Sequence, residues 1–508
     1  MTILALKEDR PTPKAVYNWR VYFCATIASF ASCMIGYDSA FIGTTLALPS
    51  FVDEFNFASY SKGSLALLKQ NIVSVYQAGA FFGSLGAYVS SYFLGRRMSL
   101  QLFTVIFILG AGMMLGANGE RGIGLIIGGR VLAGIGVGGC SNMTPIYISE
   151  LSPPAVRGRL VGIYELGWQV GGLVGFWINY GVNTTMAPSS SQWLIPFGVQ
   201  LIPAGLLFIG SLAIPESPRW LYSKGRREQA LKVLCWMRHL DPSDVYIIEE
   251  VNYIEEDLER YRREIGAGFW KPFLSLKERK IQWRFLIGAL LFVFQNGIFG
   301  VVKTALTFVW ILVLIDHLGR RMLLMIGATG GSLCMWFIGA YIKISDPEFN
   351  QSNAKLSSGG IAAIFFFYLW TAFYTPSWNG TPWVLNSEMF DQNTRSLGQA
   401  SAAANNWFWN FIIARFTEQM FNAWGYGVYF FFASLMIISV VFVFFCIPET
   451  KSVPLETMDR LFKVKPVWRA NKVIMEELRA QEEEFRENRG GLNMDDEKEH
   501  VAQVESKA

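Results

Sequence analysis

The sequence predicts an all-α polytopic membrane protein built from two six-helix bundles. Three observations lead to this class. Only 17% of the residues are charged and 52% are hydrophobic, whereas a soluble domain carries about 25% charged residues. Apolar stretches long enough to cross a bilayer recur along the chain. A glycine followed by two arginines stands next to an apolar stretch in each half, at Gly95 and at Gly319, which indicates a duplicated architecture.

The apolar stretches set the expected domain boundaries, because a hydrocarbon core about 30 Å thick needs roughly 20 residues of helix. Six stretches lie in the first half, at about 21–48, 71–93, 100–117, 124–148, 158–180 and 193–214. Four more lie later, at about 322–344, 360–386, 396–415 and 427–447. We therefore expect a cytosolic N-terminus at 1–20, a six-span bundle at 21–214, a cytosolic helical linker at 215–284, a second bundle at 285–447 and a cytosolic tail at 448–508.

The basic residues predict the orientation of the spans. Lys and Arg cluster in alternate connections, as at Arg96 and Arg97 or at Arg320 and Arg321. The connections near 181–192 and 416–427 have none. Because Lys and Arg concentrate on the cytosolic side of membrane proteins, both termini and the linker are expected in the cytosol.

A charged motif is repeated at the start of the third span and at the matching point of the second half. Beyond the glycine–arginine–arginine turn, an acid followed seven residues later by an arginine also recurs, as Glu150 with Arg157 and as Glu388 with Arg395. Arginines at helix ends bond terminal carbonyls and acids of neighbouring helices. We expect a cytosolic gate made twice; ordinary interface charges are the alternative. The predicted gate residues are Gly95, Arg96, Arg97, Glu150, Arg157, Arg159, Glu216, Arg219, Asp316, Gly319, Arg320, Arg321, Glu388, Arg395 and Glu449.

The chain resembles the sugar-porter branch of the major facilitator superfamily. The resemblance rests on the motifs at residues 95–97, 145–160, 215–220, 316–321 and 448–451. More narrowly, the stretches EDRPTPKAVYNWRVY, SCMIGYDSAFIGTTL, YELGWQVGGLVGFWINYGV and FYTPSWNGTPWVLNSEMF resemble the fungal quinate permeases. This resemblance implies the major facilitator fold and proton-coupled uptake of quinate, a polyhydroxylated cyclohexane carboxylate, across the plasma membrane.

Asp38 in the first span and Arg130 in the fourth are the charges expected to function within the membrane. Burying an ionisable group there is costly, so such a group is a functional candidate by default. The resemblance implies proton coupling, because proton-coupled sugar porters carry an acid and an arginine at the matching positions. A carboxylate paired with arginine stays ionised until the pair separates, and can then take up a proton. A static structural ion pair is the alternative.

The predicted substrate site combines amides, an acid and tryptophans. Ring faces stack on a cyclohexane or sugar ring, and amides exchange hydrogen bonds with hydroxyls; tryptophans that anchor spans at the interface are the alternative. Glu165 stands where the wider family usually has glutamine, and an acid there would repel a carboxylate substrate unless it were protonated. Pro376, Gly380 and Pro382 are expected to bend the tenth span and permit gating. The residues are Glu165, Gln169, Gln295, Asn296, Trp378, Asn379, Trp383, Asn406, Trp407 and Asn410.

The chain departs from the family pattern in two places. Tyr92 stands where an acid commonly precedes the first glycine–arginine–arginine motif. The charge contacts of this first copy of the gate, which we call a latch, are therefore expected to be weaker than those of its repeat. The apolar run 285–315 is 31 residues long, or about 46 Å of helix, too long for one span and too short for two. Basic residues flank both of its ends, so a single span would invert every later segment.

We therefore expect that about 30 residues are missing between Gly297 and Ile298, from a mispredicted intron or a defective allele. A genuine variant with a re-entrant segment is the alternative. The missing stretch would hold substrate ligands and the outer gate. A chain without it is expected to fold in its first half without transporting.

Composition excludes several other functions. The net charge of +4 is too small to imply nucleic acid, and the scattered cysteines and three histidines predict neither a metal site nor a cofactor. We expect a monomeric, multi-pass transporter that meets a small hydroxylated substrate, protons and lipid, and not an enzyme. A hexose transporter is one alternative; a nutrient sensor that does not transport, or an inactive truncated product, is another.

Overall fold

The computed structural model describes residues 12–264, 268–271, 273, 282, 284–287, 318–345, 358–390, 392–451, 453–454, 457–478 and 480. These residues form helices joined by short connections, and no strand occurs among them. Eight helical segments in this part of the chain are long and apolar enough to cross a membrane.

The first half contains a long helix for each expected span. They are α1 (Trp19–Thr45), α3 (Lys62–Phe93), α4 (Arg96–Leu115), α5 (Gly124–Leu151), α6 (Arg157–Thr185) and the pair α7 (Ser190–Val199) and α8 (Leu201–Ala213). The short α2 (Pro49–Glu54) follows α1. Helix starts follow local chemistry: the Asn18 side chain accepts the Arg20 N–H at 2.9 Å and caps α1.

The linker and the second half follow. The linker forms α9 (Pro218–Ser223), α10 (Arg227–Arg238) and α11 (Val245–Glu264). The later helices are α16 (Arg320–Ser345), α17 (Ser358–Tyr374), α18 (Thr381–Met389), α19 (Gln392–Trp424), α20 (Gly427–Cys446) and the short α21 (Met458–Leu461). Between α17 and α18 the chain forms a π-helical turn, η5 (Thr375–Asn379), which contains Pro376, one of the residues expected to bend this span.

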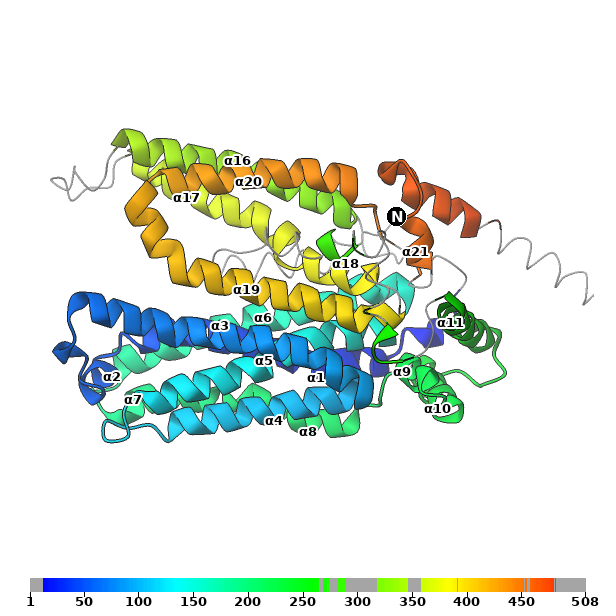
Figure 1. Cartoon of the computed structure of the whole chain (residues 1–508), viewed down its shortest axis with the longest axis horizontal. Coiled ribbons are helices and arrows are strands. Elements are labelled where there is room, and N and C mark those ends of the chain that lie inside the picture. Colours follow the sequence, from blue (N-terminus) through cyan, green and yellow to red (C-terminus); the bar gives the residue numbers. More distant parts are fainter. Residues whose placement is uncertain are drawn as a thin grey trace, which may run out of the picture.

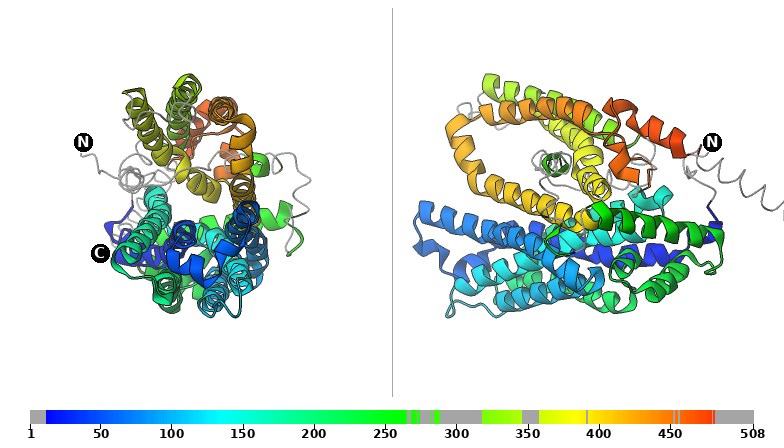
Figure 2. Two further views of the ribbon diagram at one scale, coloured as in Figure 1. Left: turned by 90° about the vertical axis from the view of Figure 1, so that its left-hand side faces the viewer. Right: turned by 45° about the vertical axis from the view of Figure 1, so that its right-hand side comes forward.

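The two halves lie side by side with their long helices roughly parallel (Figure 1). Seen end-on, the first half forms the more crowded group of helices (Figure 2). Helices α9, α10 and α11 gather at one end of the molecule, which we call the linker end. Helices α3 and α19 make the main contact between the halves, and the apolar core of the first half includes Trp383 and Trp407 of the second. Side chains from both halves therefore meet at the centre.

Candidate functional site

The first feature of the site is a buried ion pair between α1 and α5. Arg130 Nη1 donates to Asp38 Oδ1 at 2.6 Å, and the two residues are 1% and 0% exposed. Arg130 Nε also donates to the carbonyl of Ile72 on α3 at 3.3 Å. Bringing two charges out of water is unfavourable, and their attraction with added hydrogen bonds offsets that cost. The structure thus brings the two charges predicted from the sequence into direct contact.

Glu165 on α6 lies at the centre of a polar cluster that joins the two halves. Its Oε1 accepts a hydrogen bond from Gln169 Nε2 at 2.7 Å and another from the Asn379 side-chain amide. All three side chains are buried, and Asn379 is the last residue of η5. The Asn379–Glu165 bond therefore ties the broken tenth span directly to the first half.

Two predicted tryptophans lie at the same interface. Trp383 on α18 packs against Tyr164 with ring centroids 5.7 Å apart. Trp407 on α19 donates from Nε1 to Ser141 Oγ on α5 at 3.1 Å. Asn406 is buried beside it, and Asn410 Nδ2 donates to the Asn406 carbonyl at 3.0 Å. The predicted tryptophans of the tenth and eleventh spans thus reach first-half helices, whereas the Asn410 contact stays within α19.

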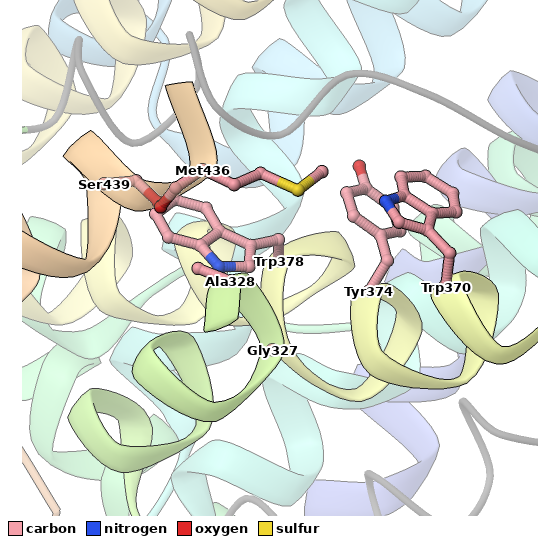
Figure 3. A pocket seen from close by; sticks show the side chains of 7 residues that line it. All are labelled: Gly327, Ala328, Trp370, Tyr374, Trp378, Met436 and Ser439. Atoms are coloured by element: carbon pink, nitrogen blue, oxygen red, sulfur yellow. The ribbon is translucent and has the colours of Figure 1, made fainter. Parts of the chain in front are cut away.

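Trp378 lies elsewhere. Its Nε1 donates to the Leu324 carbonyl of α16 at 2.9 Å, and its ring belongs to the apolar core of the second half. It lines a small pocket with Trp370, Tyr374 and Met436, drawn in Figure 3. Because that pocket is formed by α16, α17, η5 and α20, Trp378 contributes to packing within the second half.

The first glycine–arginine–arginine motif forms a latch at the linker end. Arg96 binds Glu150 through two hydrogen bonds, Nε to Oε2 at 2.9 Å and Nη2 to Oε1 at 2.8 Å. Ser217 Oγ donates to the same carboxylate. Glu216 accepts the backbone N–H groups of Arg96 and Arg97 at 2.9 and 3.1 Å, which caps α4. A carboxylate at a helix N-terminus suits both the free N–H groups and the helix dipole.

The second motif repeats this latch almost group for group. Arg320 Nη2 donates to Glu388 Oε1 at 3.0 Å, and Thr450 Oγ1 donates to Glu388 Oε2 at 2.8 Å. Glu449 accepts the backbone N–H groups of Arg320 and Arg321 at 2.9 and 3.0 Å and so caps α16. The duplication seen in the sequence is therefore a duplication of contacts.

Glycine is required at the turn before each arginine pair. Gly95 has φ +92° and Gly319 has φ +82°, values that L-residues rarely adopt. A Cβ atom would also lie 2.5 Å from Glu216 Oε2 in the first turn and 2.3 Å from Glu449 Oε2 in the second. Conformation and space therefore select glycine at both positions.

One arginine connects the latches of the two halves. Arg395 on α19 lies with Nη1 3.8 Å from Glu150 Oε1 on α5, and both side chains are buried. Arg157 and Arg219 are also buried at this end, and Arg159 is half-buried. With first-half and second-half charges in contact, the linker end is closed in this structure.

Tyr92, which replaces the usual acid, gains a cation from the linker. Lys224 Nζ lies 3.7 Å from the centre of the Tyr92 ring, within the range of a cation–π contact. Burial, together with the nearby Arg96 charge, lowers the pKa of Lys224 from its usual value. The first latch therefore has a contact at this position that does not need a carboxylate.

Several contacting residues were missed by sequence reasoning. Three of them contribute hydroxyls to the contacts described above: Ser217, Thr450 and Ser141. The fourth is Arg415 on α19, whose Nη1 donates to Gln70 Oε1 of α3 at 2.6 Å. This contact lies far from the linker end along both helices. A charge at the edge of the expected span 396–415 was the one available signal. The predicted Gln295, Asn296 and Asp316 and the junction between Gly297 and Ile298 lie outside the described residues.

Comparison with known proteins gives a consistent picture. The model of a family described as "Sugar (and other) transporter" matches residues 24–297 and 294–462. A quinate permease of Neurospora terricola is 71% identical over 538 aligned residues, with 100% of both chains covered. The MFS-type transporter qa-x of Neurospora crassa is 70% identical with the same coverage. A quinate permease of Emericella nidulans is 62% identical and covers 96% of this chain and 97% of its own.

Solved structures show the same fold. The MFS proton:xylose symporter XylE bound to 6-bromo-6-deoxy-D-glucose is 25% identical, with a TM-score of 0.75 and coverage of 88% of this chain and 100% of that one. The inward-open conformation of XylE from E. coli, also 25% identical, has a TM-score of 0.63 and coverage of 87% and 99%.

Proposed function

Because the chain belongs to the family of sugar and other transporters, we propose that it carries quinate together with protons across a membrane by alternating access. The observation that carries this proposal is the similarity, over whole lengths, to proteins of three fungi at 62–71% identity, two of them named quinate permeases. The chain is a multi-pass membrane transporter with the major facilitator fold, as the sequence predicted, and its relatives are transporters, not enzymes.

The proton is carried, in this proposal, by Asp38. The buried ion pair with Arg130 favours the charged form of this carboxylate. If the helices move and the pair separates, an isolated buried carboxylate is unfavourable and takes up a proton. The proton-coupled XylE supports a symport mechanism in this fold.

The substrate binds, in this proposal, between the halves at the centre of the molecule. Glu165, Gln169 and Asn379 supply hydrogen-bonding groups for hydroxyls, and Trp383 and Trp407 supply ring faces for the cyclohexane ring. Asn406 and Asn410 extend the amide groups along α19. Because Asn379 and Glu165 bond to each other across the halves here, an arriving hydroxyl would have to replace that bond.

The duplicated latches are, in this proposal, the cytosolic gate. The linker end is assigned to the cytosol from the distribution of Lys and Arg along the sequence, which places both chain termini on that side. We also propose that the protein acts as a monomer and that its membrane is the plasma membrane. Substrate released inward would require the contact between Arg395 and Glu150 to break.

The junction between Gly297 and Ile298 is, in this proposal, a site of lost sequence. The chain has 508 residues, but its alignments with the Neurospora relatives are 538 residues long and cover both partners fully. About 30 aligned positions therefore have no residue of this chain. The family model also matches in two segments that meet at residues 294–297. The transport activity proposed here would belong to the product that includes those residues.

Transport is tested in a fungus that lacks its own quinate permease. The chain, with the 30-residue gap filled from the Neurospora terricola relative, should restore growth on quinate; uptake of labelled glucose without uptake of quinate would favour the hexose transporter. Signalling without uptake would favour the sensor.

The Asp38→Asn variant should lose accumulation driven by a pH gradient but keep exchange of labelled quinate. Unchanged accumulation in that variant would refute proton carriage by Asp38.

A further inference from the structure

Tyr76 on α3 lies between the buried ion pair and the second half. The Arg130 guanidinium carbon is 4.2 Å from the centre of the Tyr76 ring. The same ring meets Trp407 of α19 edge to face, with centroids 6.0 Å apart and planes at 89°. Tyr76 is 2% exposed, so water does not separate these groups. One aromatic ring thus contacts both the cation of the ion pair and a tryptophan of the opposite half.

Trp407 is held on its other sides by first-half residues. Its indole stacks on Trp168 of α6 with centroids 6.0 Å apart and planes at 16°, and its N–H bonds Ser141 on α5. The Trp168 backbone touches α1 near the ion pair, since a Cβ added at Gly36 would lie 1.9 Å from the Trp168 carbonyl oxygen. The position of the Trp407 ring therefore depends on the arrangement of helices around Asp38.

The groups that face Asp38 are few among the described residues. Arg130 approaches from α5 and Tyr76 from α3, and Tyr37 is its neighbour on α1, where its hydroxyl donates to the Pro196 carbonyl at 2.8 Å. Helix α6 contributes the Trp168 backbone near Gly36. A change of charge at Asp38 therefore acts first on Arg130, and Arg130 lies against the Tyr76 ring.

We propose that Tyr76 is a positioning residue that transmits the state of the Asp38–Arg130 pair to Trp407. While Asp38 is ionised, Arg130 is held between the carboxylate and the Tyr76 ring. When Asp38 gains a proton, its carboxyl group no longer holds Arg130 by charge. The electron-rich face of the Tyr76 ring still attracts the cation, so the position of Arg130 against the ring changes. The ring then shifts against the edge of Trp407. This inference rests on the proposed proton carriage and adds the route by which it reaches the second half.

The test uses tryptophan fluorescence of the purified full chain, titrated from neutral to acid pH. The chain should show a pH-dependent change that is lost in Trp407→Phe, the reporter, and in Asp38→Asn, the titrating group. Tyr76→Leu should also lose it, because no ring remains between the two sites. Tyr76→Phe should retain a pH-dependent change, because the ring contacts both Arg130 and Trp407, although the midpoint can shift because the lost hydroxyl faces Asp38. Tyr76→Met replaces the leucine variant if the latter does not fold.

The matched control is Phe81→Leu. Phe81 meets Phe408 with centroids 6.3 Å apart, an aromatic pair between the same two helices. This variant should keep the signal. A titration in Tyr76→Leu that matches the wild type, a loss in Phe81→Leu, or a wild type without a Trp407 signal would overturn the proposal. The readout needs neither quinate nor transport, so failure of quinate uptake is distinguished from failure of this inference.

Discussion

Gly319→Ala is expected to weaken the second latch without touching any of its charged groups. Gly319 has φ +82°, and its missing Cβ leaves room for Glu449, which would otherwise lie 2.3 Å away. The added methyl would push the carboxylate from the N–H groups of Arg320 and Arg321. It would also disturb Thr450, the next residue, whose hydroxyl bonds Glu388.

The magnitude follows from two contributions. A left-handed backbone conformation costs an L-residue roughly 1–2 kcal/mol. Weakening two hydrogen bonds to a half-buried carboxylate costs about 1 kcal/mol each. The sum of about 3 kcal/mol corresponds to roughly a hundredfold change in an equilibrium between closed and open latch. Gly225→Ala is the matched control, because Gly225 has φ +76° but no atom within 4 Å of its added Cβ.

The assay measures opening of the linker end directly. Ala400 is 1% exposed and packs beside Tyr88 and Leu397 at that end, so a cysteine placed there reacts with a thiol reagent only when the halves part. Gly319→Ala should raise the labelling rate of Ala400→Cys by up to about a hundredfold, and Gly225→Ala should leave it unchanged. Equal rates in both glycine variants would refute the reasoning, since strain alone would then explain the effect.

Two further predictions concern carboxylates. Glu165→Gln is made in an Asp38→Asn background with the 30-residue gap filled. This variant should bind quinate with an affinity independent of pH, whereas its Asp38→Asn parent should bind more weakly as pH rises. Equal dependence of the affinity on pH in the two proteins would exclude charge repulsion at Glu165. Burial alone would raise the pKa of Asp459, but the hydrogen bond from Lys463 and the charge of Arg284 outweigh it and hold the pKa below its usual value. Asp459 therefore stabilises the folded tail above about pH 4, and this contribution is lost as pH falls through the lowered pKa. Asp459→Asn should lower the melting temperature at neutral pH, and the difference from wild type should vanish in acid; a difference that persisted there would contradict the ion pair with Arg284.

The fold was predictable from the sequence because burial in a bilayer leaves a direct trace in composition. Each of the ten expected spans overlaps a helix, and the π-helical turn at 375–379 contains Pro376. The duplicated latch was predictable for a similar reason, because a glycine and paired arginines next to a span recur at Gly95 and Gly319, and both glycines have positive φ. Such features depend on local chemistry, which the sequence states directly.

Other contacts were not predictable because they depend on how helices cross. Ser217 and Thr450 are common residue types, and only the structure brings their hydroxyls to Glu150 and Glu388. Tyr76 gives no sequence signal either, since an aromatic residue in a span is ordinary. Tyr92 was predicted to weaken its latch, but the cation that contacts it, Lys224, comes from the linker more than a hundred residues away.

The proposed gap after Gly297 leads to the last prediction. The region 285–315 has basic residues on both sides. If both of these basic clusters lie on the cytosolic side, as the latches of both halves do in this proposal, the chain must cross the membrane an even number of times within this region. Arg96 and Arg320 do lie in equivalent latches beside the linker and the tail. The 31 residues of this region are too few for two crossings of about 20 each. The transcript should therefore contain about 30 further codons at this point, and inserting the corresponding segment of the Neurospora terricola relative should turn a non-transporting 508-residue chain into one that accumulates quinate. Transport by the 508-residue chain itself would refute the gap and would require a re-entrant path through this region.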